Sequence, residues 1–399
     1  MTTTVPSPIS PANTVTAPAA SPMRRLLSLD ALRGLTIAFM VMVNNNGSEG
    51  AWPFMKHADW NGMTATDLVF PTFLFVVGVS IVFAYEAHLA KGATRAQLAW
   101  QTVRRAAILF CFGLIVNGFP YFHLGTLRIY GVLQRIAICY LIVSLFYLLD
   151  KRLWTKAALL IVCLFGYWAL VSLVPVPGVG MPGRDFPVLD PDRNIVNYVD
   201  QKLMPGHLYE DWTTHNLRDP EGLLSDIPAI GTALLGVMTG IFLLRFRWTE
   251  EQKALGLAAG SIKCLAIGYI WAIWFPLNKK MWTSSYVFVA AGFSLLLFAL
   301  AYWAIEVKGW KKGWTYPWLV FGSNAIVAYM ISELLSSTLD LIATATGHPH
   351  ASVDRWIFQH FNAHIPDPGW AAFSWSVLFT AACFIPVWIL YKKKIFLKV

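Results

Sequence analysis

Long apolar stretches constrain the fold of this chain more than any other feature of its sequence. A helix needs about 20 mainly apolar residues to cross the hydrocarbon core of a bilayer, and stretches of that length recur along the chain. We predict ten membrane-spanning helices, over residues 26–43, 66–88, 104–121, 127–148, 155–174, 224–245, 255–275, 284–305, 315–335 and 370–391. The predicted fold class is therefore an all-α, polytopic membrane protein.

The composition supports this class. Charged residues make up 13% of the chain, against roughly 25% in soluble domains. The net charge of +9 would suit a nucleic-acid binder, but Lys and Arg gather at the ends of the predicted helices, as membrane topology requires. We therefore expect the lipid bilayer as a partner and no nucleic acid. Each of the five cysteines lies alone in an apolar stretch, which predicts small buried side chains rather than disulfides.

The distribution of basic residues predicts the orientation of the helices. If the N-terminus is cytoplasmic, nineteen of the 31 Lys and Arg lie on the cytoplasmic side and nine on the outer side. Cytoplasmic loops carry the excess of positive charge, so both termini are predicted to be cytoplasmic. Eight of the nine histidines then lie on the outer side. Any imidazole chemistry is thus expected at the outer face.

The chain divides into a tail and one large domain. Residues 1–22 are rich in Pro, Thr, Ser and Ala and carry no charged side chain, which predicts a disordered N-terminal tail. Residues 23–399 form the predicted transmembrane domain. Two of its outer loops are long, at about 175–223 and 336–369, and loops of that length are usually functional.

The loop after the first predicted helix holds the strongest candidate residues. It begins at Asn44, ends at Gly62 and contains one histidine, His57. Asp67 opens the next predicted helix. It either accepts the second N–H of His57, which would fix the tautomer, or complements the dipole of its helix.

Ionisable residues inside membrane helices are costly and usually have a partner or a function. Asp30 and Arg33 are three residues apart in the first predicted helix and so share one face. They either pair with each other, or Arg33 faces an anionic ligand that enters from the cytoplasm. Arg135, next to Gln134, likewise requires a carboxylate, a carbonyl or a polar cavity.

Two further groups of polar residues are candidates. Asn324 and Glu333 lie in one predicted helix, about 13 Å apart at 1.5 Å per residue, so only one of them can line a given contact. The segment from Asp219 to Asp226 includes Glu221 and precedes another helix. It either caps that helix or holds a cationic or hydroxyl-rich substrate outside the membrane.

Several catalytic motifs are absent from the sequence. There is no G-x-x-x-x-G-K-[ST] loop for nucleotide hydrolysis, no H-E-x-x-H zinc motif and no G-x-S-x-G serine elbow. His348 and His350, and His360 and His364, are closely spaced, but no further ligands accompany them. We therefore expect no metal site.

Six segments, taken in order, resemble a known family. They read SLDALRGLTIAFMVMVNN, FMKHADWNGMTATDLVFPTFLFVVG, LRIYGVLQRIAICY, HNLRDPEGLLSDIPAIGTALLGV, LNKKMWTSSYVFVAAG and FGSNAIVAYMISELL. Together they are similar to the heparan-α-glucosaminide N-acetyltransferase family, and among its members to the bacterial NagX-like membrane proteins. The resemblance covers nearly all of residues 24–391.

This resemblance implies transfer of an acetyl group from cytoplasmic acetyl-CoA to the amine of a glucosamine-type sugar at the outer face. The essential histidine of the family falls on His57, and its partner asparagine falls on Asn44, with Asn45 and Asn46 as alternatives. His57 would act as a general base or carry the acetyl group itself. Asn44 would either stabilise the oxyanion or orient the imidazole.

The resemblance also guides the choice of binding residues. For the sugar we expect Asp67, Trp60, Asn61, Glu221 and Asn324. For acetyl-CoA we expect Arg24, Arg25, Arg33, Arg104, Arg105, Gln134 and Arg135, although topology alone would explain the basic residues at the inner rim. The resemblance further implies a multi-pass protein of the cytoplasmic (inner) membrane and a homodimer. The alternatives are an amino-sugar transporter without acyl chemistry, and acyl transfer to another acceptor such as a cell-wall sugar hydroxyl.

Overall fold

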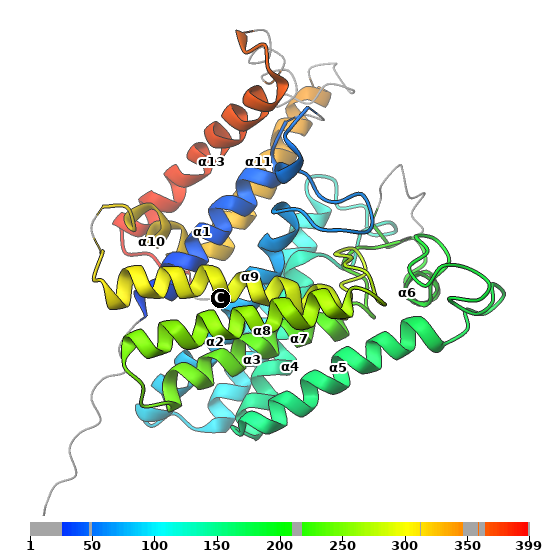
Figure 1. The fold of residues 1–399 in the computed structure, drawn as a ribbon. Helices are drawn as coiled ribbons and strands as arrows, with labels where there is room; N and C mark the ends of the chain where they lie inside the picture. The colour runs from blue at the N-terminus through cyan, green and yellow to red at the C-terminus, as the bar shows by residue number, and fades with distance from the viewer. Residues whose placement is uncertain are drawn as a thin grey trace, which may run out of the picture.

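A computed structural model describes residues 26–47, 50–209, 218–311, 313–345, 358 and 364–397 (Figure 1). The predicted tail, Arg24 and Arg25 lie outside these residues. The described part contains ten helices that are long and apolar enough to cross a membrane. The prediction of an all-α, multi-pass membrane protein is thereby confirmed.

Among the described residues, the ten long helices are accompanied by five short helical segments, of which two adjoin a long helix. The long helices are α1 (Leu27–Asn44), α2 (Val69–Ala90, preceded by the 3-10 turn η2, Thr66–Leu68), α3 (Arg95–Gly118), α4 (Val132–Leu149), α5 (Leu153–Leu173), α7 (Asp226–Arg245), α8 (Glu250–Trp271), α9 (Ser284–Tyr302, continued by the π-helical η3, Trp303–Val307), α11 (Ala325–Ala345) and α13 (Pro368–Lys392). The other short segments are η1 (Pro53–Met55), α6 (Ile195–Leu203) and α10 (Tyr316–Ser323).

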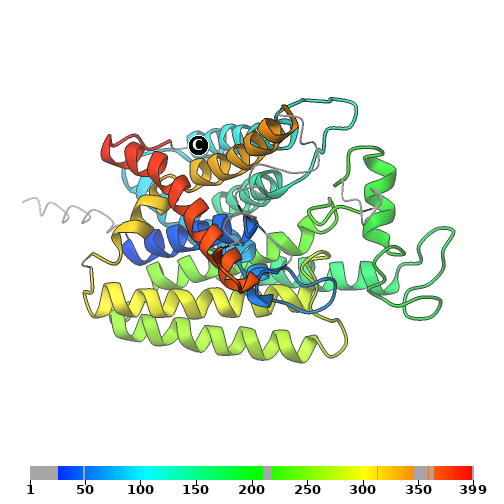
Figure 2. The same cartoon turned by 90° about the horizontal axis from the view of Figure 1, so that it is seen from above.

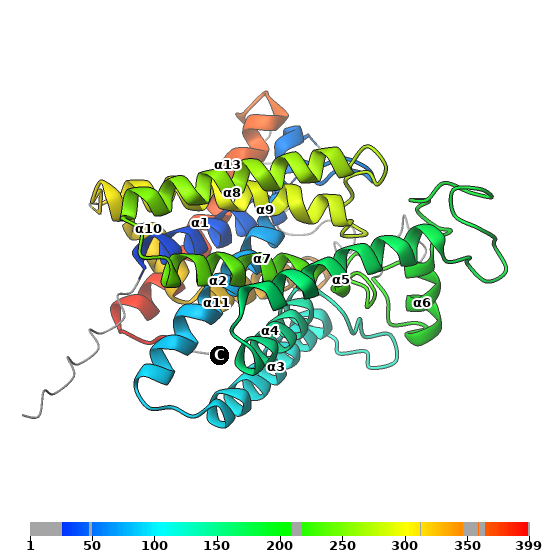
Figure 3. The same ribbon diagram turned by 60° about the horizontal axis from the view of Figure 1, so that its bottom comes forward.

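Three helices form the centre of the bundle. Figure 3 shows α1, α2 and α7 between the pair α8 and α9 on one side and the pair α3 and α4 on the other. In the span of α7, 78% of the residues are buried, against 22% in α3. The outer helices thus present most of their apolar residues to the surroundings, as lipid-facing helices do.

Small residues bring the central helices close together. A Cβ added to Gly78 of α2 would lie 2.1 Å from the carbonyl oxygen of Ala233, and one added to Gly236 of α7 would lie 2.1 Å from that of Phe75. Only glycine fits at such contacts, and small residues are typical of packed membrane helices. The backbone of the bundle core is therefore closely packed beneath the polar loops.

The start of two outer helices follows directly from local sequence. Thr94 accepts a hydrogen bond from the backbone N–H of Gln97, and the Gln97 side chain accepts one from Thr94, which forms a capping box at α3. Thr249 and Gln252 repeat the arrangement at α8. Each box satisfies backbone donors that have no partner in the first helical turn.

The ninth predicted helix, over 315–335, is wrong in its bounds. The chain forms α10, leaves helical geometry at Asn324 and continues as α11 to Ala345. The outer loop predicted from residue 336 is therefore helical at its start. Apolar residues on both sides of Asn324 predicted one continuous helix, but the helical geometry is interrupted at Asn324.

The ends of other helices also differ from the prediction. α3 begins at Arg95 rather than residue 104, so Arg104 and Arg105 lie inside the helix, about 14 Å from its start at 1.5 Å per residue. α4 begins at Val132 rather than 127, which leaves Arg128 in a loop. The predicted loop 175–223 contains the helix α6.

The connections that follow α1, α3, α5 and α8 lie at one end of the bundle, here called the loop end (Figures 1 and 2). This is the end that was predicted to face outward. It contains His57, Arg128, Glu221 and Lys279, which come from four different connections.

Candidate active site

His57 and Asp67 form a hydrogen-bonded pair at the loop end. The Nδ1 atom of His57 lies 2.6 Å from Oδ1 of Asp67. Oδ2 of Asp67 accepts the backbone N–H groups of Ala58 and Thr64, at 3.0 and 2.9 Å. Because a carboxylate only accepts hydrogen bonds, Nδ1 carries the proton and Nε2 keeps its lone pair. Of the two roles considered for Asp67, the contact with His57 is present.

The pair differs in exposure. The side chain of Asp67 is 1% exposed, whereas that of His57 is 44% exposed. Tyr286 of α9 donates its hydroxyl to the backbone carbonyl of Asp67 at 2.5 Å, which fixes the start of η2 and α2 from the neighbouring helix. The imidazole is therefore fixed by a buried carboxylate at Nδ1, and much of the ring remains accessible to solvent.

The His57 loop is docked on the connection between α8 and α9. The backbone N–H of Gly62 donates to the carbonyl of Leu277 at 2.8 Å. Beside it, the Nδ2 atom of Asn278 donates to Oδ1 of Asn61 at 3.2 Å. Asn61, a predicted sugar contact, therefore has its carboxamide oxygen engaged within the protein.

This docking places Lys279 beside the imidazole. Its Nζ atom lies 3.4 Å from both Nδ1 and Nε2 of His57. Burial and the Lys279 charge lower the pKa of His57, although Asp67 and Glu221 act in the opposite direction. Burial also lowers the pKa of Lys279. The imidazole is thus biased toward its neutral form, in which Nε2 can accept a proton or attack a carbonyl.

A second cluster of charged residues is centred on Arg128. Its guanidinium contacts both oxygens of Asp219, at 2.9 and 2.5 Å, and Oε2 of Glu221, at 2.6 Å. The ring of Tyr209 lies 4.6 Å from the guanidinium carbon. Arg128 holds the pKa of Glu221 below its usual range against the effect of burial. The loop between α3 and α4 is therefore tied to the segment before α7.

Arg135 belongs to a buried ion pair. Its Nε donates to Oδ1 of Asp226 at 2.8 Å, and its Nη2 donates to the carbonyl of Gly222 at 3.2 Å. The guanidinium also lies over the ring of Trp282, at 4.8 Å. That Arg135 binds acetyl-CoA stays a prediction, and its side chain is fully buried beside Asp226.

The asparagines after α1 have separate partners. Asn45 and Asn46 donate to the carbonyls of Val41 and Met55, at 3.0 and 3.1 Å. Asn44 reaches another helix, where its Nδ2 lies 3.4 Å from Oε1 of Glu333. Of the three asparagines, only Asn44 has a described side-chain hydrogen bond to a residue outside α1 and the loop that ends at Gly62.

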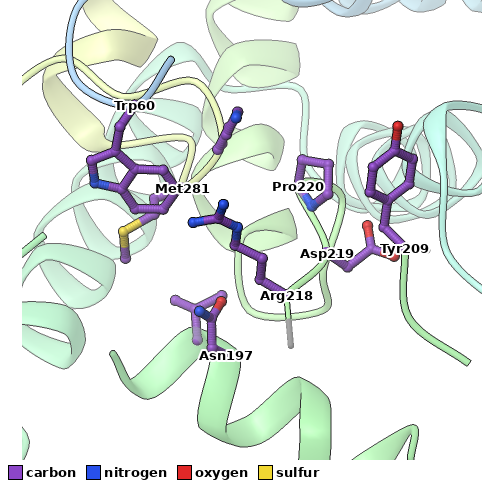
Figure 4. A pocket seen from close by; sticks show the side chains of 9 residues that line it. Trp60, Asn197, Tyr209, Arg218, Asp219, Pro220 and Met281 are labelled. Carbon is purple, nitrogen blue, oxygen red and sulfur yellow. The ribbon is translucent and has the colours of Figure 1, made fainter. Parts of the chain in front are cut away.

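Trp60 lines a small pocket in Figure 4, together with Asn197, Tyr209, Arg218, Asp219 and Met281. Trp60 donates its ring N–H to the carbonyl of Leu189 at 2.7 Å, and the Arg218 guanidinium lies 5.1 Å from its ring centre. The cavity volume is about 40 Å³, which suits a few water molecules rather than a sugar.

Other predicted binding residues lie away from His57. Asn324 binds the chain end instead, through the backbone of Ile395 and Leu397 at 3.1 and 3.0 Å. Arg33 contacts Asp30 at 3.3 Å and Ser80 at 3.0 Å, so the predicted Asp30–Arg33 pair is present.

The α3–α4 pair carries three more of the predicted residues. Arg104 and Arg105 are exposed on α3, and Arg105 lies over the ring of Tyr140 at 5.1 Å. Gln134 is buried near Gly113, with no hydrogen bond to its amide among the described residues. Neither group touches the His57 site.

Sequence reasoning missed Lys279 and the role of Arg128. Both were counted only as charges for topology. The sequence did offer a signal for Lys279, because Asn278-Lys279-Lys280 stands between an apolar stretch and a tryptophan in one of the segments that carry the family resemblance. In the part of the chain that the structure describes, no cluster of His, Cys, Asp and Glu could hold a metal ion. His348, His350 and His360 lie outside that part.

Comparison with known proteins identifies the relationship. Residues 25–177 match the family model of the heparan-alpha-glucosaminide N-acetyltransferase catalytic region. The chain is related to the heparan-α-glucosaminide N-acetyltransferases. It is 29% identical to the human enzyme of that name over 94% of its own length, and 29% identical to the mouse enzyme over 95%. The family prediction is confirmed, and the matched segment contains the His57–Asp67 pair. The chain spans about 60% of the length of these two relatives.

Proposed function

We propose that this protein transfers an acetyl group from acetyl-CoA to the amine of a glucosamine-type sugar, with His57 at the centre of the reaction. The observation that carries the proposal is the His57–Asp67 pair, a half-exposed imidazole on a buried carboxylate. The names of the relatives support the reaction class. Cytoplasmic acetyl-CoA, an outer acceptor site and location in the inner membrane are parts of the same proposal.

The pair supplies what acyl transfer needs. Asp67 holds the proton on Nδ1, so Nε2 is available. In direct transfer, Nε2 accepts the proton of the attacking amine and then delivers it to the departing thiolate. In the covalent route, Nε2 attacks the thioester carbonyl, expels the thiolate and passes the acetyl group to the amine. Both routes use the same tautomer.

Asn44 is the proposed partner of His57. A carboxylate accepts hydrogen bonds, so Glu333 orients the carboxamide with Nδ2 toward itself. The second N–H of Nδ2 and the oxygen Oδ1 remain for the reacting groups. A preorganised amide donor to an oxyanion contributes about 3–4 kcal/mol.

Binding of the two substrates is proposed at opposite sides of this centre. Glu221 and Trp60 lie at the loop end and remain the proposed contacts for the acceptor sugar, outside the small pocket that Trp60 lines. Asn61 supports the loop on which Trp60 lies. Arg33, which lies deeper in α1, is the proposed contact for the anionic part of acetyl-CoA. Asp67 is reassigned from sugar binding to orientation of His57, since its two oxygens have partners in the protein.

The experiment is acetyl transfer from radiolabelled acetyl-CoA to glucosamine by the purified protein in detergent. Wild-type protein should form N-acetylglucosamine, and His57→Ala should lose at least about 10²-fold in kcat. His123→Ala is the matched control, because His123 stacks on Tyr121 in another loop and its loss should leave kcat unchanged. If wild-type protein binds the sugar without consuming acetyl-CoA, the transporter alternative replaces this proposal. If a hydroxyl acceptor competes and is acetylated instead, the acceptor class is wrong.

A further inference from the structure

We propose that Lys279 is a second catalytic residue, which holds His57 in its neutral form and presents an ammonium group to the acetyl oxygen during transfer. The inference rests on the proposed function and deepens it. Its basis is the position of Nζ, 3.4 Å from Nε2 of His57. An acyl group that reacts at or beside Nε2 must lie within reach of that ammonium.

A rigid turn presents Lys279 to this position. The backbone N–H of Trp282 donates to the carbonyl of Lys279, and that of Thr283 donates to Asn278, both at 3.0 Å. Trp282 has a φ of +52°, a left-handed conformation that is uncommon for a residue other than glycine. Such backbone conformations persist where the surrounding structure enforces them, and they cluster at functional sites.

The anchor of this turn is the Trp282 side chain. It is fully buried, its ring N–H donates to Thr232 at 3.1 Å, and its ring packs against Phe70 and under Arg135. α2, α4 and α7 therefore all fix the turn that carries Lys279. A lysine needed only for solubility would not require this support.

The charges around the pair determine its protonation. Asp67 and Glu221 face His57 and favour its cation, while Lys279 and burial oppose it. Glu221 and Asp67 also face Lys279, as do the cations of Lys280 and Arg135. Neither carboxylate forms a salt bridge with Lys279 among the described residues. Among the described residues, His57 is the side chain within hydrogen-bonding distance of the Lys279 ammonium, and two cations at 3.4 Å would repel each other.

This arrangement gives Lys279 a defined part in the reaction. The amine attacks the thioester carbon, and the carbonyl π electrons move to the oxygen, where the Lys279 ammonium stabilises the negative charge. His57 takes the amine proton at Nε2. The oxyanion then collapses, the carbon–sulfur bond breaks, and the thiolate receives that proton from His57. Lys279 remains protonated throughout, so the proton count balances.

The first test measures protonation of His57 without using activity. The full-length protein in detergent is treated with diethylpyrocarbonate, which modifies neutral imidazole, and the His57 peptide is quantified by mass spectrometry from pH 5 to pH 8. We expect the midpoint for Lys279→Met to lie about one pH unit above that of wild type, as for removal of a like charge at close range. Lys279→Arg should restore the wild-type midpoint. Lys280→Met removes an equal charge one residue away and should not move it. An unchanged midpoint in Lys279→Met would overturn the proposal.

The second test measures transfer. Lys279→Met should lower kcat by about 10²-fold and change the KM for acetyl-CoA by less than twofold, because the ammonium acts on the oxyanion and not on the bound thioester. A rise in KM with unchanged kcat would overturn the oxyanion role. If the midpoint shifts but wild-type protein transfers no acetyl group, the proposed function fails while the coupling of Lys279 to His57 stands.

Discussion

The two ends of the helical bundle use polar residues in different ways. At the loop end, buried charges form pairs that connect elements far apart in sequence, such as Arg135 with Asp226 and Arg128 with Asp219. At the opposite end, Asn324 binds backbone groups after α13, and Thr94 and Thr249 cap helices. The opposite end has ion pairs too, Asp30–Arg33 and Glu86–Lys151, but their side chains are 11–29% exposed. At the loop end, the side chains of Arg135, Asp226 and Asp219 are at most 5% exposed, where burial of charge is most costly.

This difference suggests that polar residues at the loop end serve function, whereas those at the opposite end serve folding. Buried ion pairs contribute little net stability, because desolvation offsets their attraction. Their concentration around His57 is explained better by a need for a preorganised electrostatic site than by a need for stability. Substitutions at the loop end should therefore change activity, protonation or buried charge balance. Apart from those at Arg33, the proposed acetyl-CoA contact, substitutions at the opposite end should change stability alone.

The largest effect is expected from Asp67→Asn. The N–H groups of Ala58 and Thr64 would bind the new carboxamide oxygen, so its NH2 group would face Nδ1 of His57. The imidazole would then carry its proton on Nε2 and could not act as a base. We expect kcat to fall by about 10⁴-fold, the loss found when the acid of a serine protease triad is amidated. Steady-state kinetics with an unchanged unfolding temperature would establish the tautomer effect. Activity within tenfold of wild type would contradict it.

The next effect is on stability at the same end. Arg135→Met leaves Asp226 buried without its cation, which should lower the free energy of unfolding by about 3–5 kcal/mol. Arg105→Met is the matched control, because Arg105 is exposed on α3, and it should cost less than about 1 kcal/mol. Thermal unfolding in detergent compares the two. Adding Asp226→Leu to Arg135→Met should recover most of the loss, and no recovery would mean that the pair has another role.

A buried acid at the loop end should make stability depend on pH. Burial, with the charges of Asp219 and Asp226, raises the pKa of Asp200 from 3.8 to about 7. The folded state thus favours the protonated carboxyl. Its contribution to stability is complete below pH 3.8 and is lost as the pH rises through about 7.

Asp200→Asn should remove this loss, which is at most about 4 kcal/mol at 1.36 kcal/mol per pKa unit. The wild-type unfolding temperature should therefore fall between pH 5 and pH 8 by more than that of the variant. Asp192→Asn, at an exposed position in the same loop, is the control and should behave as wild type. Parallel pH curves for wild type and Asp200→Asn would show that Asp200 does not titrate in this range.

The comparison of the two ends also shows what the sequence could predict. Ten apolar stretches predict ten helices, because lipid exposure and length leave few other solutions. The His57–Asp67 contact was accessible because a short loop brings two residues ten positions apart together. These features depend on local sequence, and hydropathy or spacing reveals them.

Features that depend on packing between distant segments were not accessible. Lys279 lies 222 positions from His57, and nothing in the local pattern places one beside the other. The break at Asn324 was missed because flanking apolar residues conceal it. The side chain at the break binds the backbone of Ile395, more than seventy residues away. The protein partner of Arg135 was not accessible either, because Asp226 belongs to a helix 91 positions further on.

The smallest effect is expected at the opposite end, from Asn324→Ala. The substitution removes two bonds to the backbone of Ile395 and Leu397 and should lower the free energy of unfolding by about 1–2 kcal/mol. Since Asn324 lies away from His57, neither kcat nor the KM for the sugar should change by more than twofold. Thermal unfolding and transfer kinetics on the same preparation measure both quantities. A residue that only secures the chain after α13 has no way to affect sugar binding. A selective rise in the KM for the sugar would therefore indicate that Asn324 belongs to the acceptor site, and it would contradict the distinction between the two ends.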